Sequence, residues 1–544
     1  MVRLEKRTVV SVLLFSLTPT KPYRVLLFRR SEKVSTYRKK LAPIAGSVEL
    51  DDKTPLDAAW RELKEETCLG PQQIELWRRG PGFQFTDEKA VVGKDGKGET
   101  VGRTWHVWPF AFRFKKELVD EHNNVVDPSV FKMNWEHLNL EWNFVEDILD
   151  GKILDQCVPR LEITLGQVWV DPESQLYKGM EELRLDHTHG ARELATMAVK
   201  SLVRIIERDD SQQREKKMGT LSSEGLERWW KDVRLQAFHL AFNARPSMSA
   251  AISSAIVNAL QAAQSIVDTG GPTVMEDVKS TLEAYVARRT EIARRVSEQF
   301  STLLKGMFPS TNQDESDRTV PIKIMTLSFS STIKAAILHA LDEDETRTIE
   351  LCILESRPLF EGASFAQALT KEAQDRLQGQ KAGPQIHSRL RIYVSTDASV
   401  GVLSRDADLL IIGADRISES GDVSNKTGSL PAVLTSKEVT HGSIKVICIS
   451  ESDKIAPPGA AEEHSEEDNN KAEVTRTWTT NLSSCWDEMV TIRNVYFEWV
   501  PAKYIDLYVC EDGVLGQDDI KTKSRLVADL TTKAFSDLSK ARDF

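Results

Sequence analysis

The stretch Leu409-Leu-Ile-Ile-Gly-Ala-Asp-Arg-Ile417, followed by Gly421-Asp-Val423 and Asn425-Lys-Thr-Gly428, decides the fold of the C-terminal part of this chain. Its apolar start predicts a buried strand, and the polar run follows directly where that strand ends. In an open parallel sheet the ligand crevice forms at the carboxyl ends of the strands. A strand that ends in a polar turn would explain Asp415 and Gly421 but not the whole run. The stretch therefore predicts a ligand site.

Apolar runs recur on both sides of this stretch, with helical segments between them. We expect strands at Ile322–Thr326, Ile349–Leu354, Leu390–Val394, Leu409–Ile412 and Lys445–Ile449. Alternating strands and helices are typical of a parallel sheet. We therefore predict an α/β fold class, with a Rossmann-like parallel-sheet domain over residues 319–540 that follows a polar loop at 309–318.

The segment before this sheet has no β-rich runs and shows helical periodicity instead. The periodic segments are Ala191–Ile206, Leu226–Phe242, Ser249–Val267 and Val274–Met307. They predict an all-helical subdomain over residues 176–308. Two polar and charged segments, 208–217 and 456–473, are expected to be solvated loops.

The first 165 residues mix β-rich runs with helices, which predicts a separate α+β unit. The β-rich runs are 9–17, 24–30 and 104–114, and the helical segments are Pro55–Glu66 and Trp142–Leu149. Residues 82–102 are expected to form a loop without a readable specificity code.

Three carboxylates mark the first of these helices. Glu62, Glu65 and Glu66 are spaced i, i+3 and i+4, which places them on one helical face. Such a face is usually just solvated, but it also suits a hard divalent cation that sits between carboxylates and a diphosphate.

The context of the helix favours the second interpretation. Gly46, Glu49 and the run Arg61-Glu-Leu-Lys-Glu-Glu66 resemble the Nudix box of a family of pyrophosphate hydrolases. The resemblance implies a Nudix α/β/α sandwich over residues 1–165, with Glu62, Glu65 and Glu66 as ligands of Mg (or Mn) and Arg61 holding the helix against the loop. The gap before Arg61 is one residue longer than in the box, so Asp52 takes the place of a Glu, and Cys68 replaces a Gly. An acidic residue of the segment 135–142 is expected to assist as a base.

The C-terminal part resembles the family shared by the alpha, beta and delta subunits of translation initiation factor 2B, methylthioribose-1-phosphate isomerase and ribose-1,5-bisphosphate isomerase. Besides the 409–428 stretch, the matching strings are His189-Gly-Ala-Arg-Glu-Leu-Ala195, Ala244-Arg-Pro-Ser247, Ile324-Met-Thr-Leu-Ser328, Glu355-Ser-Arg-Pro-Leu359, Glu361-Gly362, Pro501 and Glu511-Asp-Gly513. They occur in family order across about residues 180–530.

The resemblance also implies chemistry. The isomerases move a proton between sugar carbons with a Cys and an Asp; Asp415 matches the Asp, but Ser328 stands at the Cys position and Glu361 stands where the isomerases carry Gln. A serine hydroxyl ionises far less readily than a thiol, so we expect binding of a sugar phosphate without isomerisation. The implied ligand-binding residues are Gly190, Ala191, Arg245, Ser328, Glu361, Asn425 and Lys426.

Composition limits the class of protein. The 544 residues carry a net charge of -11 with 40% hydrophobic and 28% charged residues, which is ordinary for globular domains and argues against a general nucleic-acid binder. Six widely spaced cysteines favour neither a zinc ribbon nor a disulfide scaffold. We expect no membrane-spanning helix and a cytoplasmic location.

These observations lead to one hypothesis with two alternatives. We expect a Mg-dependent hydrolase of a nucleoside-diphosphate-linked or phosphosugar pyrophosphate, fused to a sugar-phosphate-binding domain, and a homodimer. The first alternative is a non-catalytic regulatory protein similar to initiation factor 2B, with translation initiation factors as partners. The second is an active aldose-ketose isomerase that tolerates Ser328.

Overall fold

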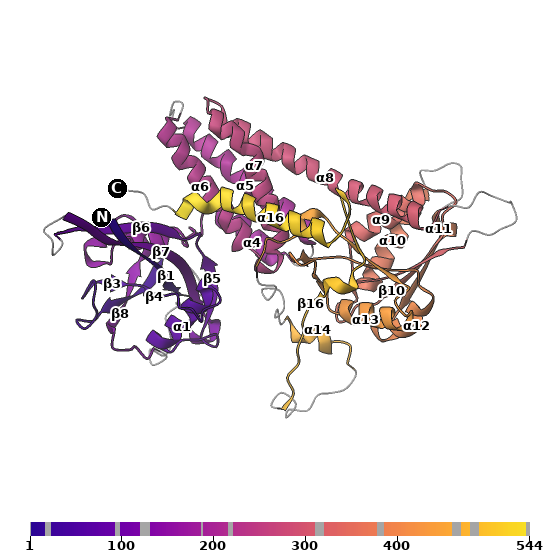
Figure 1. Ribbon diagram of the computed structural model, residues 1–544, viewed down its shortest axis with the longest axis horizontal. Helices are drawn as coiled ribbons and strands as arrows, with labels where there is room; N and C mark the ends of the chain where they lie inside the picture. Colours follow the sequence, from indigo (N-terminus) through magenta and orange to yellow (C-terminus); the bar gives the residue numbers. More distant parts are fainter. Residues whose placement is uncertain are drawn as a thin grey trace.

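The chain is known from a computed structural model that describes residues 2–16, 23–92, 98–119, 131–186, 189–215, 221–309, 320–377, 386–459, 469–478 and 489–539. It is a mixed α/β protein in which an N-terminal sheet, a group of long helices and a second sheet follow one another along the longest axis (Figure 1). The loop expected at 309–318 lies almost wholly outside the described residues.

The N-terminal part is built on one mixed sheet. Its strands, among the described residues, are β1 (Val2–Phe15), β2 (Arg24–Arg30), β3 (Leu41–Ala42), β4 (Ile44–Ser47), β5 (Ile74–Arg79), β6 (Phe83–Val92), β7 (Gly98–Phe114) and β8 (His137–Phe144). Strand β1 runs parallel to β7, and the remaining pairs are antiparallel. Helix α1 (Pro55–Thr67) packs on one face, and α2 (Val145–Leu149) and α3 (Leu161–Gly166) pack on the other.

Helix α1 begins and ends where its sequence dictates. Thr54 and Asp57 form a capping box in which each side chain accepts from the other residue's backbone N–H, at 3.3 and 2.8 Å. Pro55 occupies the first turn, where no donor is lost. The helix ends at Cys68, whose φ of 59° lies in the left-handed region that glycine prefers. These caps fix the position of the carboxylate face.

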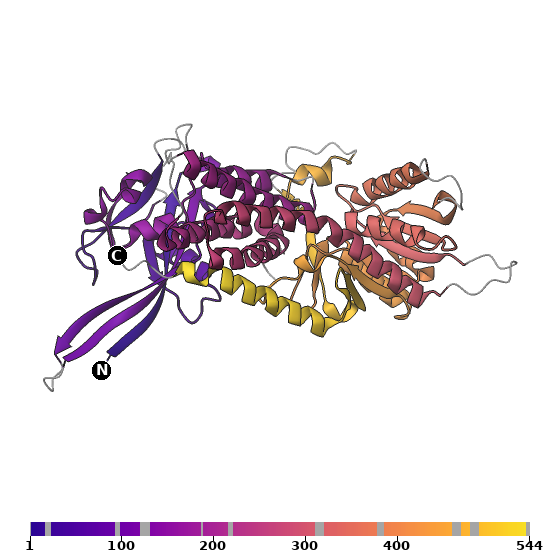
Figure 2. The ribbon, with the colours of Figure 1, turned by 90° about the horizontal axis from the view of Figure 1, so that it is seen from above.

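Two expectations for this part are wrong. Residues 83–92 and 98–102 are not a loop but belong to the long hairpin β6–β7, which projects beside the N-terminal end of β1 (Figure 2). Trp142 is not helical either, because β8 continues to Phe144 and α2 starts at Val145. In the hairpin, strand pairing overrides a local pattern that is rich in charged residues.

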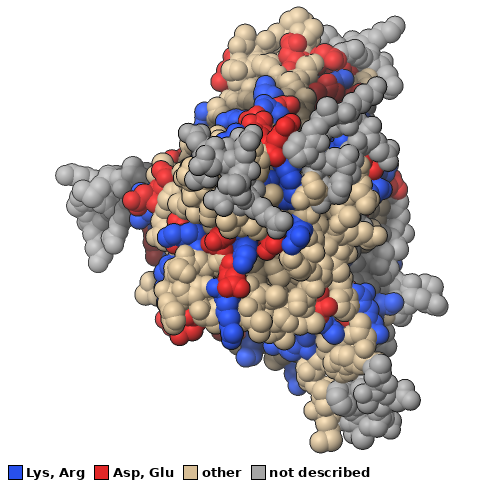
Figure 3. Space-filling view, turned by 90° about the vertical axis from the view of Figure 1, so that its right-hand side faces the viewer, with Lys and Arg blue, Asp and Glu red and all other residues tan. Residues whose placement is uncertain are grey.

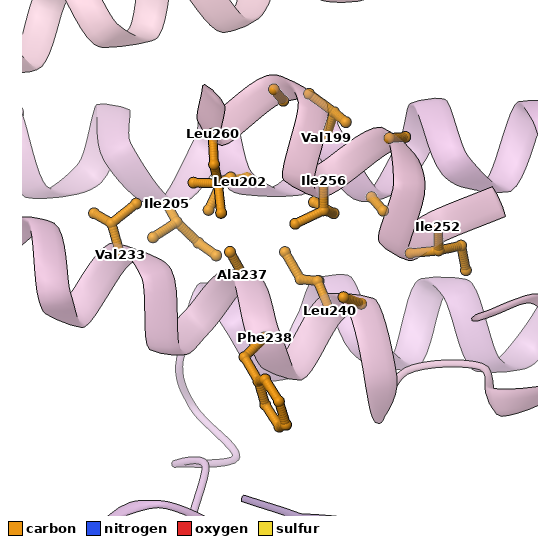
Figure 4. Close-up of a cluster of buried hydrophobic side chains, with 14 of the residues drawn as sticks. Val199, Leu202, Ile205, Val233, Ala237, Phe238, Leu240, Ile252, Ile256 and Leu260 are labelled. Atoms are coloured by element: carbon orange, nitrogen blue, oxygen red, sulfur yellow. The ribbon is translucent and has the colours of Figure 1, made fainter. Parts of the chain in front are cut away.

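The central helices are α4 (Gln175–Leu185), α5 (Ala191–Glu215), α6 (Ser223–Phe242), α7 (Ser249–Thr269) and α8 (Val274–Met307). Apolar side chains of α5, α6 and α7, such as Leu202, Leu240 and Ile256, meet in a common core (Figure 4). The expectation of a solvated loop at 208–217 is wrong up to Glu215, because α5 extends through these residues. The helices otherwise match the predicted periodic segments.

Helix α7 is the most apolar of these helices. With the turn before it, Pro246–Thr269 is long and apolar enough to cross a membrane, with a mean hydropathy of 1.3 in its most apolar window, of which 67% is buried inside the fold. Its packing against α5, α6 and α8 is that of a core helix.

The C-terminal sheet has the order β11-β10-β9-β12-β15-β17-β18 and is parallel except for β18. Its strands are β9 (Ile322–Leu327), β10 (Ile349–Leu354), β11 (Leu390–Ser395), β12 (Leu409–Ile412), β15 (Lys445–Ile449), β17 (Leu507–Cys510) and β18 (Gly513–Leu515). A small antiparallel sheet joins β13 (Arg416–Ile417), β14 (Val423–Lys426) and β16 (Phe497–Val500). All the strands predicted here are confirmed.

The other helices of this part are α9 (Ser331–Asp342), α10 (Glu361–Leu377), α11 (Ile386–Arg389), α12 (Val400–Leu403), α13 (Ser429–Val439), α14 (Lys471–Thr475) and α16 (Gln517–Phe535). Of these, α16 runs back along the central helices and packs on α7 and α6 (Figure 1). The segment 456–473, expected to be a loop, contains the start of α14, while 460–468 lie outside the described residues. Helix α8 ties the parts together, because Leu282 lies in the helical core and Phe300 in the core of the sheet.

The N-terminal sheet is also bonded to the helical part. The side chain of Asn243, at the end of α6, accepts from the N–H of Arg79 (2.9 Å) and donates to its carbonyl (2.8 Å). The Gln167 amide donates to the carbonyls of Gly82 (3.0 Å) and Leu538 (3.3 Å). We call this contact, formed by residues 77–79, 167, 239 and 243, the seam.

The seam buries a cation. Arg78 is 2% exposed, its guanidinium lies 3.9 Å from the centre of the Trp77 ring, and burial lowers its pKa to about 9. His239, 1% exposed, contacts Asn243 through Nδ1. Burial, with the nearby charge of Arg78, lowers the pKa of His239 to about 3. The imidazole is therefore neutral in the folded protein.

Candidate functional sites

The first candidate site lies on helix α1 beside strand β4. Gly46, in β4, leaves room for the Glu62 carboxylate: a Cβ on Gly46 would lie 1.9 Å from its carboxyl carbon. No side chain other than hydrogen fits there without moving Glu62. Burial raises the pKa of Glu62, with Arg61 opposing that shift. Glu62 is thus held against the strand in a partly desolvated position.

Arg61 connects the helix to the preceding loop. Its guanidinium donates to Asp52 (3.0 and 3.3 Å) and to the Ser47 carbonyl (2.8 Å). On the helix itself it donates to Glu62 (2.7 Å) and lies 3.5 Å from the exposed Glu65. These hydrogen bonds raise the pKa of Arg61 and lower that of Asp52. Two of the three predicted ligands therefore converge on one internal cation.

The third predicted ligand points elsewhere. Glu66 is 3% exposed, and its Oε2 is in hydrogen-bond contact with Nε2 of the buried His137, at the start of β8. Burial raises the pKa of Glu66, and His137 opposes this shift. The sequence missed His137 as a site residue because 71 positions separate the two side chains and only the fold joins them.

One of the two acidic side chains of the late segment, that of Glu141, is paired rather than free. Glu141 forms a two-point ion pair with Arg29 (2.6 and 3.0 Å), which lowers the pKa of its carboxyl. The Glu136 backbone carbonyl accepts from Ser31. The segment contributes His137 to the site through the contact with Glu66.

The carboxylates of α1 can be tested as a metal site. Among the described residues, no group of three His, Cys, Asp or Glu side chains is close enough to share an ion. Glu62 and Glu65 nevertheless face one cation, the Arg61 guanidinium, and hard divalent cations prefer such oxygen ligands. The residues therefore fit an ion held by Glu62 and Glu65, with Glu66 joining only if it shares its carboxylate with His137.

The second candidate site lies at the carboxyl ends of β9, β10 and β12. Ser328, directly after β9, donates to Glu361 Oε2 (2.7 Å), and Lys426 Nζ lies 3.2 Å from Glu361 Oε1. The Ser328 N–H donates to the Ser356 hydroxyl (2.6 Å), after β10. The fold thus brings Ser328, Glu361 and Lys426 together, as parallel-sheet topology requires.

The other predicted ligand-binding residues are placed around this centre. Asn425 donates to Ser429 (2.9 Å), and its Oδ1 lies near Gly413. Arg245 donates to the Asp186 carbonyl. Gly190 precedes α5 and Ala191 begins it. The next residue, Arg192, donates to Ser331 (3.3 Å) at the start of α9. The start of α5 therefore reaches the sheet, while Arg245 is engaged toward α4.

Asp415, the predicted acid/base residue, lies beside a largely buried lysine, Lys454, that no sequence motif marks. The Lys454 ammonium lies 3.5 Å from the Glu451 carboxylate, which accepts from Thr332 (2.6 Å). Burial lowers the pKa of Lys454, but Glu451 and then Asp415 outweigh it, so the pKa is raised overall. Lys454 follows the end of β15, a position that the strand pattern could have flagged.

One cysteine lies close to Gly413, in the stretch that carries Asp415. Cys448 in β15 contacts the Gly413 carbonyl (4.0 Å), but it is fully buried, and burial raises its pKa to about 12. The five described cysteines are free thiols. A buried thiol of this kind stays protonated at neutral pH.

Two family models match the chain. That of the initiation factor 2 subunit family matches residues 187–517, and that of the NUDIX domain matches residues 6–154. The NUDIX domain supports a hydrolase, and the initiation factor part is related to sugar-phosphate isomerases and to subunits of initiation factor 2B.

Curated relatives match part of the chain. Methylthioribose-1-phosphate isomerase of Syntrophotalea carbinolica is 29% identical over 177 residues, 31% of this chain and 49% of the relative. A putative translation initiation factor eIF-2B subunit 2-like protein of Pyrococcus horikoshii is 28% identical over 192 residues, 35% and 57% of the two chains. Ribose 1,5-bisphosphate isomerase of Haloterrigena turkmenica is 25% identical over 171 residues, which are 30% of this chain and 51% of the relative. The chain spans about half the length of the curated relatives it matches.

Solved structures show distant likeness. The translation initiation factor eIF-2B of Pyrococcus horikoshii is 22% identical with a TM-score of 0.41, over 63% of this chain and 97% of that one. A chain of the eIF2B-beta2-delta2 complex from C. thermophilum is 12% identical with a TM-score of 0.44, over 71% and 98%. On the family match over more than half of its length, the chain belongs to the initiation factor 2 subunit family and carries a NUDIX domain in front of the family region.

Proposed function

We propose that the N-terminal part is a Mg-dependent (or Mn-dependent) hydrolase of a pyrophosphate bond in a nucleoside-diphosphate-linked or phosphosugar substrate. The observation that carries the proposal is the convergence of Glu62 and Glu65 on Arg61, with Glu62 seated on Gly46. Nudix hydrolases generally use divalent metals such as magnesium. A bound ion would neutralise diphosphate charge and activate water.

The chain's own residues have defined tasks in this reaction. Glu62 and Glu65 would hold the cation, and Arg61 keeps α1 at a fixed distance from the loop through Asp52 and Ser47. His137 orients Glu66 from the interior. Residues that hold ligands in this way commonly change metal affinity when they are replaced.

For the C-terminal part we propose a sugar-phosphate-binding domain, of Rossmann-like type, without isomerase activity. Ser328 carries a hydroxyl where the reaction needs an ionisable thiol, and Cys448 is too deeply buried to replace it. One substrate would connect the two parts. If water cleaved the terminal phosphate from the pyrophosphate of phosphoribosyl pyrophosphate, the products would be inorganic phosphate and ribose 1,5-bisphosphate, a substrate type of the relatives.

The first test is hydrolysis. Purified protein would be incubated with Mg²⁺, a panel of nucleoside diphosphate conjugates and phosphoribosyl pyrophosphate, beside the variant Glu65→Gln/Glu66→Gln. The control is Glu146→Gln, a similar change at an exposed position of α2. Cleavage by the parent and the control but not by the double variant supports the proposal. If no substrate is cleaved, or the double variant is equally active, the hydrolase proposal fails.

A second candidate function is that of a non-catalytic regulatory protein with translation initiation factors as partners. The engagement of Glu66 by His137 and of Lys426 by Glu361 favours it, because both ligands are already paired. Stable co-purification with initiation factor 2 at physiological salt would support this candidate. A protein that cleaves a substrate and captures no such factor would exclude it.

The isomerase alternative rests on Asp415 and is tested separately. If ribose 1,5-bisphosphate or methylthioribose 1-phosphate is turned over, Asp415→Asn should abolish turnover because the carboxylate would carry the proton. Unchanged turnover in the variant would reject Asp415 as the acid/base residue.

We further propose a cytoplasmic homodimer that forms through the C-terminal sheet region and binds neither membranes nor nucleic acid directly. Two exposed apolar side chains on the neighbouring helices α12 and α13, Val402 (68% exposed) and Leu434 (39%), support a protein contact there. On the face in Figure 3, basic and acidic side chains are interspersed rather than gathered into a basic field. Light scattering of a Val402→Glu/Leu434→Glu variant tests the dimer; an unchanged mass would contradict the surface.

A further inference from the structure

In the C-terminal site, a carboxylate of the chain itself contacts the side chains that are candidates for binding phosphate. One oxygen of Glu361 accepts from the Ser328 hydroxyl (2.7 Å), and the other lies 3.2 Å from the Lys426 ammonium. Both oxygens are therefore used on residues that the sequence assigns to ligand binding. A phosphate group would use the same donors in the same way, through anionic oxygens.

The lysine has little freedom to serve two anions at once. Lys426 Nζ lies 4.7 Å from the ring centres of both Tyr496 and Phe497, and its side chain is 24% exposed. The cavity beside it, lined by residues that include Glu361 and Lys426, has a volume of about 20 Å³. That space suits about one water molecule. A phosphorylated sugar can reach Lys426 only if the Glu361 carboxylate moves.

The position of Glu361 is fixed by the backbone around it. Glu361 begins α10, and a Cβ on the next residue, Gly362, would lie 1.8 Å from the Leu354 carbonyl at the end of β10. Phe360 and Ser328 both adopt positive φ angles, 58° and 64°, which are uncommon for residues with side chains. The carboxylate is thus presented to the pocket by a tightly packed junction between strand and helix.

We propose that Glu361 is an internal competitor for the ligand's phosphate and so sets the specificity of this site. The carboxylate takes up the donors of Lys426 and Ser328, and a ligand phosphate must displace it and then lie beside its negative charge. Like charges placed together at a binding site are unfavourable. Affinity for phosphorylated sugars is therefore held low, whereas a neutral sugar is not subject to this competition. The inference rests on the proposed sugar-phosphate site.

Removing one charge tests the competition directly. Binding of ribose 5-phosphate, inorganic phosphate and neutral ribose would be measured by calorimetry on the full chain, without divalent metal, for the parent and Glu361→Gln. The matched control is Glu372→Gln, the same change on the same helix, at a residue paired with Lys334 and Arg376 away from the pocket. Lys426→Met removes the cation for which phosphate and carboxylate compete.

We expect Glu361→Gln to bind both phosphate-containing probes at least about tenfold more tightly than the parent, with no change for ribose. The control should match the parent, and Lys426→Met should lose the gain when combined with Glu361→Gln. Glu361→Ala, which removes the carboxylate altogether and leaves both donors in place, should give a gain of similar size. This variant also keeps the test decisive if thermal denaturation shows that Glu361→Gln is poorly folded.

Two results would overturn the inference in different ways. If parent and Glu361→Gln bind ribose 5-phosphate equally and Lys426→Met weakens both, the sugar-phosphate site stands and the competition is refuted. If none of the variants binds either phosphate-containing probe, the proposed site itself falls, and the inference falls with it.

Discussion

In each of the two candidate sites, the predicted ligand-binding side chains are paired with an oppositely charged side chain of the same chain. That partner is a cation in the first site and an anion in the second. On α1, carboxylates suited to a metal cation are paired with Arg61; after β14, a lysine suited to a phosphate is paired with Glu361. Arg61 also bonds Asp52 and the Ser47 carbonyl, so it belongs to the frame that joins loop and helix. Both carboxylate oxygens of Glu361, in contrast, contact side chains of the pocket, Ser328 and Lys426. Loss of Arg61 should therefore dismantle a site, while loss of the Glu361 charge should open one.

The largest effect is expected for Arg61→Ala. The variant leaves Asp52 and Glu62, whose side chains are 7% and 12% exposed, without their cation. We expect the free energy of unfolding to fall by about 2–3 kcal/mol, measured by urea denaturation, and Mn²⁺ binding to be lost.

The matched control is Arg7→Ala, because Arg7 pairs with Glu5 on β1 and its side chain is 45% exposed. Its cost should stay within about 0.5 kcal/mol. Equal costs for the two variants would show that Arg61 is an ordinary surface cation and would remove the contrast with Glu361.

Asn243→Ala asks whether the two sites belong to one cooperative unit. The change removes both hydrogen bonds to the Arg79 peptide in the seam, at a cost of about 2 kcal/mol. In calorimetry we expect the N-terminal part to unfold ahead of the rest, while the exposed Asn139→Ala on β8 leaves the transition unchanged. A single unshifted transition in Asn243→Ala would mean that the seam does not couple the parts.

The seam should also make stability depend on pH. The pKa of His239 is about 3 in the folded chain, below its ordinary value of about 6.5, so the unfolded state binds a proton first as pH falls. Its contribution is complete above about pH 6.5 and is lost as pH falls toward 3. By pH 5 the loss amounts to about 2 kcal/mol. His239→Gln should flatten this part of the curve of unfolding free energy against pH. Parallel curves for parent and variant would contradict a buried neutral imidazole.

The smallest effect concerns the end of α1. Cys68 adopts a φ of 59°, a conformation that costs a residue with a side chain about 1 kcal/mol relative to glycine. Cys68→Gly should therefore raise the free energy of unfolding by up to about 1 kcal/mol without changing Mn²⁺ affinity. A loss of stability would show that the thiol makes a contact worth more than the strain.

Sequence patterns predicted the C-terminal sheet well for a physical reason. Strands buried on both faces, such as Leu409–Ile412, are unbroken apolar runs. The hairpin of β6 and β7 was missed because its charged residues and glycines are also typical of a loop. Only the pairing of β6 with β7, and of β7 with β1, shows that these residues form strands. The prediction of a loop at residues 208–215 was wrong for a similar reason, because a solvent-exposed helix and a loop can have the same polar composition.

The candidate sites were predictable as far as local spacing reaches. The spacing of Glu62, Glu65 and Glu66 follows from the helix, but it could not show that His137 would engage the third. The strand pattern placed Ser328 and Asp415 at one edge of a sheet, yet the contacts of Lys454 and the pairing of Glu361 with Lys426 depend on loops whose paths no local signal encodes. In each case, the sequence pattern could not identify the contact partner that lies far away along the chain.

Gly46 offers a way to separate the chain's activities in a living cell. Its missing side chain is all that lets the Glu62 carboxylate rest on β4, so one added methyl group would displace that carboxylate while every charge of the protein stays in place. A Gly46→Ala allele would thus silence the proposed hydrolase without altering net charge or touching the seam and the C-terminal pocket. Any phenotype it shares with a full deletion would belong to hydrolysis, and whatever it spares would belong to the remainder of the chain.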